Sequence, residues 1–198
     1  MKKVYFDVEA TSVNRASASI FQIGAIVVNE EGNIEKAYSR FVKPYELISG
    51  GAIAVTGVSN QEADFLSQGM TLDEFYDEME EVLFSEPCEL VCHNIEFDFT
   101  LLKNNLAHYK LPMYENIVSK FCTMNTFSKI VTGNGKRAKL SRLYEHAAEI
   151  AVCSTDELEE MFNDEVIPKV VGKVRGANFH DALWDSFCCF FIDLIFRG

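Results

Sequence analysis

The segment Phe6–Glu9 (FDVE) holds two carboxylic acids, Asp7 and Glu9, two positions apart. Alternate side chains of a β-strand point to the same face, so two ionised carboxylates there would repel each other in a partly buried site. A divalent cation removes this repulsion, and carboxylate oxygens are suitable ligands for Mg²⁺ or Mn²⁺. The pair therefore fits a metal site, or else two acids on a solvated strand face.

Two further clusters combine acids with a histidine. His93–Asp98 (HNIEFD) lies where an apolar run leads into a helical pattern, and His180–Asp185 (HDALWD) begins the last apolar helix. Because Glu96 and Asp98 face different ways on a helix, we expect only one of them to reach a site. Taken singly, these acids could instead complement the positive end of a helix dipole, and a histidine there could cap or pack.

The segments that carry these clusters predict a mixed α/β fold. Lys3–Glu9 alternates like a half-buried strand, with Val4, Phe6 and Val8 on one face. Two β-rich runs separated by a turn predict a hairpin, and strands followed by helices favour a mixed sheet flanked by helices. The other expected elements are strands at 20–29, 34–42 and 89–92, and helices at 71–84, from 95, and at 123–131, 140–150, 155–162 and 179–196.

The length of 198 residues and the hydrophobic content of 48% favour one domain spanning residues 1–198. Residues 151–178 have the weakest periodicity, and we interpret them as an insertion or cap. The apolar run Phe187–Phe196 is broken by Asp193 and is shorter than the ~20 residues of a membrane span, so we expect no membrane association. Six cysteines without metal-site spacing, and no apolar signal-peptide core, favour a reducing, cytoplasmic location.

The formal net charge is −12, which disfavours a protein that grips a long duplex, because phosphate contacts require Lys and Arg. An enzyme that takes a chain end into a pocket is compatible with this charge, since bound cations neutralise part of it. No Lys or Arg occurs from Pro44 to Leu102, and the densest basic run is Gly133–Arg142. We therefore interpret Lys136 and Arg137 as candidate contacts to a polyanionic substrate.

Taken in order, the three clusters resemble the motifs of the DEDD exonuclease superfamily, histidine branch, which includes the proofreading exonuclease subunit of bacterial replicative polymerases. Asp7–Glu9 is similar to the first motif, Asp-x-Glu, and His93–Asp98 to the second, His-Asn-x-x-Phe-Asp. His180–Asp185 is similar to the third, in which four residues separate His from Asp. Phe21–Ile26 (FQIGAI) and Val55–Ser59 (VTGVS) also resemble the second strand of the family and the turn after its third strand.

The resemblance implies a ribonuclease-H-like fold with a mixed five-stranded sheet flanked by helices. It implies a 3′→5′ exonuclease that releases nucleoside 5′-monophosphates from the 3′ end of nucleic acid by two-metal-ion catalysis. In the family, four acids hold two Mg²⁺ or Mn²⁺ ions, and the histidine is the general base for the attacking water. The implied residues are Asp7, Glu9, Asp98 and Asp185 as metal ligands and His180 as the base, with substrate contacts at Ala10, Thr11, Ser12, His93 and Asn94.

The substrate and the partners are less constrained. Many family members continue the first motif with Thr-Thr-Gly, whereas this chain has Ala10–Ser12 (ATS), and Glu-Ala-Thr also occurs among RNA-trimming relatives. We expect single-stranded DNA ends as the substrate, with trimming of RNA or short oligonucleotides as the alternative. A DNA polymerase or repair complex is a candidate partner, and a homodimer is a further option.

Three other classes of protein share parts of this pattern. A phosphatase of the haloacid dehalogenase type also begins with an acidic strand, but its second acid is Asp where this chain has Glu9. A catalytically retired binding module would be free to lose the acids that this chain retains. An endonuclease on a ribonuclease-H-like scaffold also uses clustered carboxylates, and it would release oligomers instead of mononucleotides.

Overall fold

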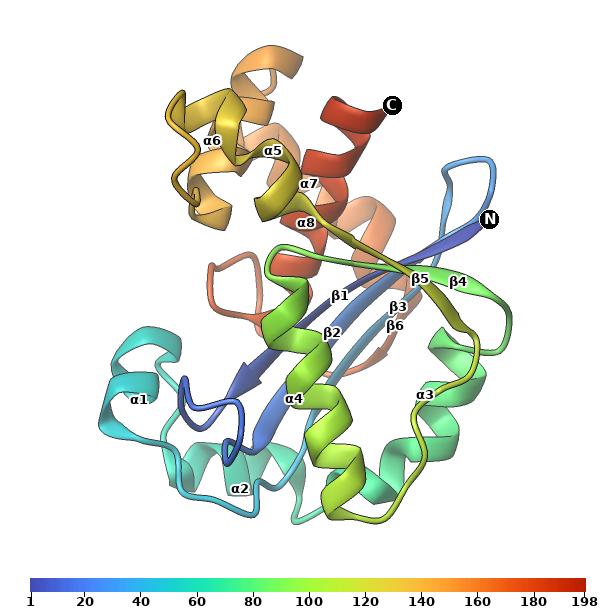
Figure 1. The fold of residues 1–198 in the computed structure, drawn as a ribbon, viewed down its shortest axis with the longest axis vertical. Helices are drawn as coiled ribbons and strands as arrows, with labels where there is room; N and C mark the ends of the chain where they lie inside the picture. The colour runs from blue at the N-terminus through green and yellow to red at the C-terminus, as the bar shows by residue number, and fades with distance from the viewer.

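The computed structural model describes every residue from Met1 to Gly198 and has a mixed sheet of six strands flanked by helices (Figure 1). The strand order is β5-β4-β1-β2-β3-β6, and the central β1 is parallel to β4 and antiparallel to β2. The predicted mixed α/β sheet is confirmed. The strands are β1 (Lys2–Ala10), β2 (Ile20–Val28), β3 (Ile34–Phe41), β4 (Cys88–Cys92), β5 (Ile117–Cys122) and β6 (Val170–Gly172).

Helices cover both faces of the sheet. In Figure 1, α3 and α4 lie in front of it and α8 lies behind it, while α5, α6 and α7 lie beside α8. No helix is both long and apolar enough to cross a membrane. The helices are α1 (Gly50–Thr56), α2 (Asn60–Ser67), α3 (Tyr76–Leu83), α4 (Ile95–His108), α5 (Thr123–Thr132), α6 (Leu140–Ala151), α7 (Thr155–Met161) and α8 (Ala182–Arg197), with short helical turns η1 (Leu72–Phe75), η2 (Phe162–Val166) and η3 (Ile167–Lys169).

The sheet has one strand more than the five expected. β6 has only three residues and pairs in parallel with Ala37–Ser39 of β3, so it is too short to carry a periodic signal. It lies within the segment 151–178, which we interpreted as an insertion or cap. In this segment Leu158, Phe162 and Val166 are fully buried against the core behind the sheet. No residue of the segment lines the cavity described below.

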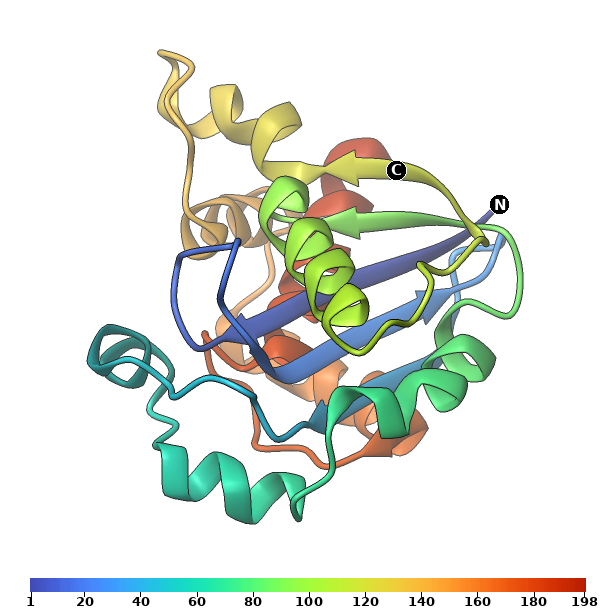
Figure 2. The same cartoon turned by 60° about the horizontal axis from the view of Figure 1, so that its bottom comes forward.

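The two faces of β1 belong to two different cores. Val4, Phe6 and Val8 are buried in the core in front of the sheet, whereas Tyr5 is buried in the core that contains α8. Alternation along the strand therefore turns Tyr5, and with it the acids of the first motif, toward α8. In the turned view of Figure 2, β1, β4 and β5 all run toward the same side of the molecule, so the ends of β1 and β4 lie close to the start of α4.

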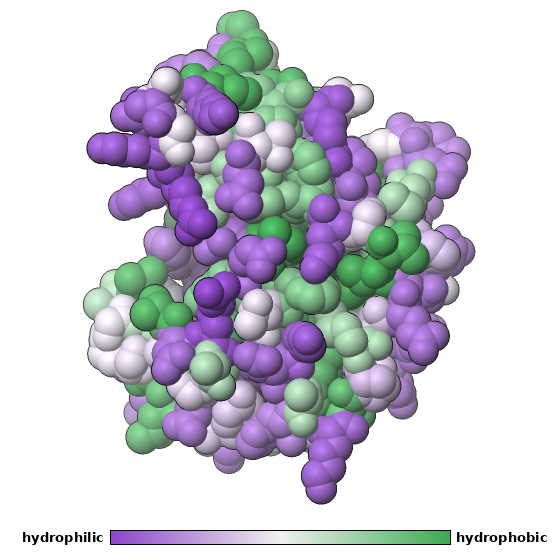
Figure 3. Space-filling view, in the orientation of Figure 1, coloured by the Kyte–Doolittle hydropathy of each residue, from purple (hydrophilic) through white to green (hydrophobic).

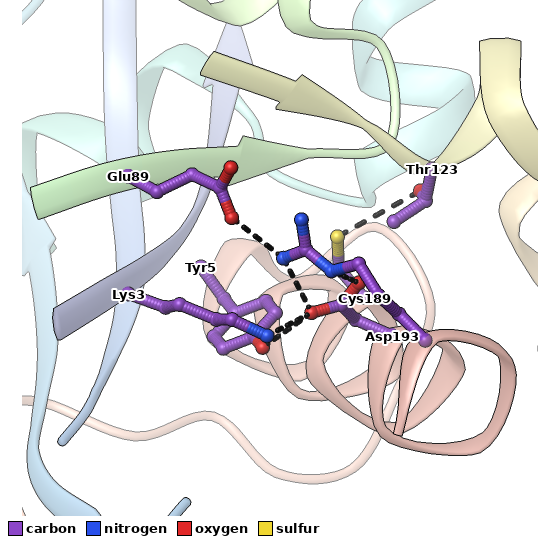
Figure 4. A network of polar contacts seen from close by, with 7 residues as sticks. Lys3, Tyr5, Glu89, Thr123, Cys189 and Asp193 are labelled. Carbon is purple, nitrogen blue, oxygen red and sulfur yellow. Dashed lines mark hydrogen bonds and ion pairs between the residues drawn. The ribbon is translucent and has the colours of Figure 1, made fainter. Parts of the chain in front are cut away.

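The far half of α8 is fastened to β1 and β4 by a buried polar network (Figure 4). Asp193, which is 1% exposed, accepts hydrogen bonds through Oδ2 from the Tyr5 hydroxyl at 2.7 Å and the Lys3 ammonium at 3.0 Å. The Arg197 guanidinium donates to the same oxygen at 2.8 Å and to Glu89 at 2.6 Å. A buried carboxylate with two cationic partners is well satisfied, so this network holds α8 at a fixed place along β1.

Candidate active site

A cavity of about 720 Å³ opens at the carboxyl end of β1, between α1, the first turns of α4 and α6, and the turn before α8. In Figure 3 the surface is indented on its left side, below hydrophilic side chains of the α5–α6 region. The structure brings the five residues expected to do chemistry to this cavity. Its wall consists of Asp7, Val8, Glu9, Val55, His93, Asn94, Phe97, Asp98, Lys139, Leu140, Ser141, Phe179, His180 and Asp185.

β1 and α4 position the acids of the first two motifs. Asp7 and Glu9 are half-buried at the end of β1 and share one face, because the buried Val8 between them belongs to the opposite core. α4 begins shortly after β4, and Asp98 in its first turn is only 3% exposed. Glu96, two residues earlier, is exposed to solvent. Of the two acids in α4, only Asp98 lines the cavity.

The third motif forms a tight turn that leads into α8. Asp181 is the N-cap residue, and its Oδ1 accepts a hydrogen bond from the Leu183 amide at 3.2 Å. His180 has a φ of 64°, which is uncommon for a residue other than glycine, and its amide donates to Asp185 Oδ2 at 3.2 Å. One ligand atom from each of Glu9, His180 and Asp185 lies within 4.8 Å of the others. A single cation or water could therefore contact all three side chains.

The carboxyl groups of this cavity have raised pKa values. Burial is the largest cause for Asp7 and Glu9, and the negative charges of the neighbouring acids add to it. Burial also raises the pKa of Asp98 from 3.8 to about 7 and that of Asp185 from 3.8 to about 8. In addition, Asp185 Oδ1 is buried without a hydrogen-bond partner. A divalent cation is the group that would satisfy this oxygen and make ionisation of the crowded acids favourable.

The two histidines of the motifs have different surroundings. His180 is exposed at the cavity mouth, and its pKa is lowered by burial of part of the ring and by the positive charge of Lys139. In His93, Nδ1 is hydrogen-bonded to the Thr123 hydroxyl at 3.1 Å and Nε2 to the Ala138 carbonyl at 3.0 Å. Burial lowers the pKa of His93 to about 4. His93 therefore ties the end of β4 to the first residue of α5 and to the loop before α6, whereas the His180 ring has no such hydrogen bonds.

Of the expected substrate contacts, the structure brings His93 and Asn94 to the cavity and leaves the others outside its wall. Ala10 and Thr11 are buried, and the Thr11 amide already donates to the Ser19 carbonyl at 2.9 Å. The Thr11 hydroxyl in turn accepts a hydrogen bond from the Ser19 amide at 2.9 Å. The amide of Thr11 is thus engaged by its own loop, and Ser12 does not line the cavity.

Lys136 and Arg137 are exposed in the loop between α5 and α6, and they do not line the cavity either. The basic residue that does so is Lys139, at the N-cap of α6. Of the basic residues in the run Gly133–Arg142, only Lys139 lines the cavity, and the density of basic residues could not indicate which side chain would do so. Leu140, Ser141 and Phe179 also line the cavity, although none of them belongs to the three motifs. Val55 lines it too, and it begins the segment Val55–Ser59, which resembled a turn of the family but was not expected to reach the site.

Comparison with known proteins identifies the family. A sequence model of the exonuclease family RNase_T matches residues 4–186, so the chain belongs to this family. The expected likeness to the DEDD exonucleases is confirmed. Over 112 residues, 55% of its length, the chain is 30% identical to the 3′-5′ exonuclease DinG of Bacillus subtilis. Over 111 residues, 56% of its length, it is 28% identical to a PolC-type DNA polymerase III of Streptococcus agalactiae.

The fold resembles that of exonuclease I, with a TM-score of 0.69 at 16% identity over 99% of this chain and 41% of that one. A zinc-bound complex of E. coli exonuclease I with single-stranded DNA gives a TM-score of 0.68 at 18% identity, over 99% of this chain and 40% of that chain. At this level of identity the likeness concerns the fold. The matched regions cover only 11% of DinG and 7% of the polymerase, so these relatives contain much that this chain does not.

Proposed function

We propose that this chain is a metal-dependent 3′→5′ exonuclease that removes nucleoside 5′-monophosphates from the 3′ end of single-stranded DNA. The observation that carries the proposal is the meeting of Asp7, Glu9, Asp98, Asp185 and His180 at one cavity, although they come from three distant parts of a chain of the exonuclease family. Such a constellation fits hydrolysis of a phosphodiester. The single-domain organisation over residues 1–198 and homodimerisation stay predictions.

The four acids are the proposed ligands of two Mg²⁺ or Mn²⁺ ions. Their raised pKa values and the unpartnered Asp185 Oδ1 fit a cation better than a metal-free cluster. When bound, divalent ions supply an activated water and neutralise the charge that develops on the leaving 3′ oxygen. The carboxylates of Asp7 and Glu9 share one strand face and those of Asp98 and Asp185 close the site from two helices, so all four side chains approach from rigid elements.

His180 is the proposed general base. Burial of part of its ring and the positive charge of Lys139 keep its pKa below the ordinary value, so the imidazole is unprotonated at neutral pH. A ring nitrogen can then accept the proton of the attacking water. Because the His180 amide donates to Asp185 at 3.2 Å, the base is tied to a proposed metal ligand. His93 does not compete for this role, since both of its ring nitrogens are already engaged.

The proposed substrate is a single strand that enters end first. A cavity of about 720 Å³ has room for a terminal nucleotide, and Phe97 and Phe179 supply apolar surface near a base. Lys139 on the wall, with Lys136 and Arg137 in the preceding loop, offers positive charge to the phosphates that follow. The complex of E. coli exonuclease I with single-stranded DNA and the similarity to a DNA polymerase III favour DNA. Association with a polymerase or repair complex is a weaker proposal, which rests on the similarity to the PolC-type polymerase.

The test is a digestion of matched single-stranded DNA, single-stranded RNA and duplex DNA, each labelled at the 5′ end or at the 3′ end, with Mg²⁺ and with Mn²⁺. We expect mononucleotides from the 3′ label and a shortening ladder from the 5′ label, with DNA degraded faster than RNA. Oligomeric products would point to an endonuclease, and faster loss of RNA would point to an exoribonuclease. If no substrate is degraded with either metal, the enzymatic proposal is wrong.

Two matched variants in α4 control this experiment. Asp98→Asn removes a buried acid of the cavity, and Glu96→Gln removes an exposed acid two residues away on the same helix. We expect the first change to abolish trimming, because one ligand of the proposed metal pair is lost, and the second change to leave it intact. Equal effects of the two substitutions would contradict the assignment of Asp98.

A further inference from the structure

β2 contains a glutamine that contacts the third motif directly. Gln22 is paired with Glu9 across the β1–β2 ladder, and it is 0% exposed. Its Nε2 donates a hydrogen bond to Asp181 Oδ2 at 2.8 Å. Asp181 itself is 3% exposed and lies between His180 and the first turn of α8. One side chain of β2 thus joins the strand position next to Glu9 to the turn that presents His180.

The same stretch of β2 lies very close to the backbone at the start of α8. Gly24 is paired with Asp7, and a Cβ on Gly24 would lie 2.0 Å from the backbone of Ala182. Only glycine allows this approach. The Ser186 hydroxyl also donates to the Gly24 carbonyl at 2.9 Å. The start of α8 therefore packs directly on β2, at the position that is paired with Asp7 of the first motif.

Gln22 is an energetically unfavourable residue at this position if it only fills the core. Its Oε1 is buried without a hydrogen-bond partner, and an unsatisfied buried polar atom is unfavourable. An apolar side chain of similar size would avoid this cost. What such a side chain could not supply is the donor to Asp181, whose Oδ1 is meanwhile occupied in capping α8 through the Leu183 amide.

We propose that Gln22 is a positioning residue that sets His180 relative to the acids of β1 by holding the carboxylate of Asp181. This inference rests on the proposed function. In this proposal Asp181 contacts neither the substrate nor a reacting atom. One of its carboxylate oxygens accepts the hydrogen bond from the Gln22 amide, and the other caps α8. The rigid ladder between Glu9 and Gln22 then fixes the distance from the first motif to the His180 turn.

Three variants test the inference by removing and then inverting the amide–carboxylate pair. Gln22→Met keeps the length of the side chain and removes the donor. Gln22→Glu places two carboxyl groups against each other. The double variant Gln22→Glu/Asp181→Asn restores one amide and one carboxylate in reversed order, and the asparagine can still cap α8.

We expect Gln22→Met and Gln22→Glu to lower kcat for single-stranded DNA on the order of 100-fold at pH 8, with KM nearly unchanged, because small misplacements of catalytic groups have effects of this size. The double variant should recover most of that loss. Tyr5→Phe is the matched control, since it removes a hydrogen bond to the far half of α8 and should leave kcat unaltered. Wild-type kcat in Gln22→Met, or failure of the double variant to improve on Gln22→Glu, would overturn the inference.

A second readout does not depend on activity. The chain has four histidines, so the ring resonances of ¹³C-histidine-labelled protein can be assigned by single substitutions. We expect Gln22→Met to shift the His180 resonance and leave that of His93 in place. An inactive wild-type protein would refute the proposed function alone, whereas an unmoved His180 resonance would refute the positioning role.

Discussion

Asp98 should lower the stability of the metal-free protein, because its burial makes ionisation unfavourable. The pKa of Asp98 is raised from 3.8 to about 7 in the folded chain. A group whose pKa is raised on folding contributes stability that is fully present below the unfolded value and is lost as the pH rises through the folded value. Metal-free protein should therefore be more stable at pH 5 than at pH 8.

The size of the effect follows from the displacement of this pKa. Each unit corresponds to about 1.4 kcal/mol, so ionised Asp98 costs the fold at most about 4 kcal/mol at pH 8. Between pH 5 and pH 8, ionisation of Asp98 should lower the free energy of unfolding by about 2 to 3 kcal/mol. The other acids shift in the same direction, because burial raises their pKa values too. Because the amide in Asp98→Asn does not ionise, this variant should lack the part of the pH-dependent loss of stability that comes from Asp98.

Urea unfolding in EDTA, followed by far-ultraviolet circular dichroism, measures this effect. We expect the free energy of unfolding of the wild type to fall from pH 5 to pH 8, and that of Asp98→Asn to fall less and to exceed the wild type at pH 8. With Mn²⁺ the order should reverse, since the wild type gains more from a bound cation than the variant does. Metal-free wild type that is more stable at pH 8 than at pH 5 would refute the electrostatic reasoning.

Three further predictions concern the surroundings of the site. Lys139→Ala should raise the pKa of His180, since a positive neighbour is lost, and the acid limb of the kcat/KM profile should move to higher pH. Tyr5→Phe should lower the free energy of unfolding by about 1 kcal/mol, measured in urea, because Asp193 loses one donor. Gly24→Ala should destabilise the fold by at least about 1 to 3 kcal/mol, measured by thermal unfolding, because its Cβ meets the backbone of α8 at 2.0 Å.

Several elements were predictable because their periodicity is local. The β2–β3 hairpin, the strand–helix unit of β4 and α4, and the last helix all have apolar residues at the spacing that their structures require. The residues of the three motifs were identified for a different reason. Their spacing matches a family pattern, and the same spacing places Asp7 and Glu9 on one strand face and Asp98 within the first turn of a helix.

Other elements were not predictable, for physical reasons. β5 (IVSKFC) has no continuous apolar run, and β6 gains its strand conformation only from pairing with β3. α1 and α2 are short, and capping by Ser49 and Ser59 defines their starts more than any apolar periodicity does. The contact between Gln22 and Asp181 joins residues 159 positions apart, and no local pattern reports such a pair.

The two ends of α8 have opposite effects on the fold. At its start, Asp185 has a pKa raised to about 8 and an oxygen without a partner, so this end is unfavourable until a cation binds. Eight residues on, Asp193 is similarly buried, but its Oδ2 accepts hydrogen bonds from Lys3, Tyr5 and Arg197, and its Oδ1 lies 2.8 Å from Arg197 Nε. Breaking such a buried ionic network by removing one charged partner typically costs about 3 to 5 kcal/mol. The end of α8 that contains Asp193 therefore keeps the helix docked, while the end that contains Asp185 stays available for metal and substrate. For this reason, loss of the Asp193 network should impair folding before it impairs catalysis.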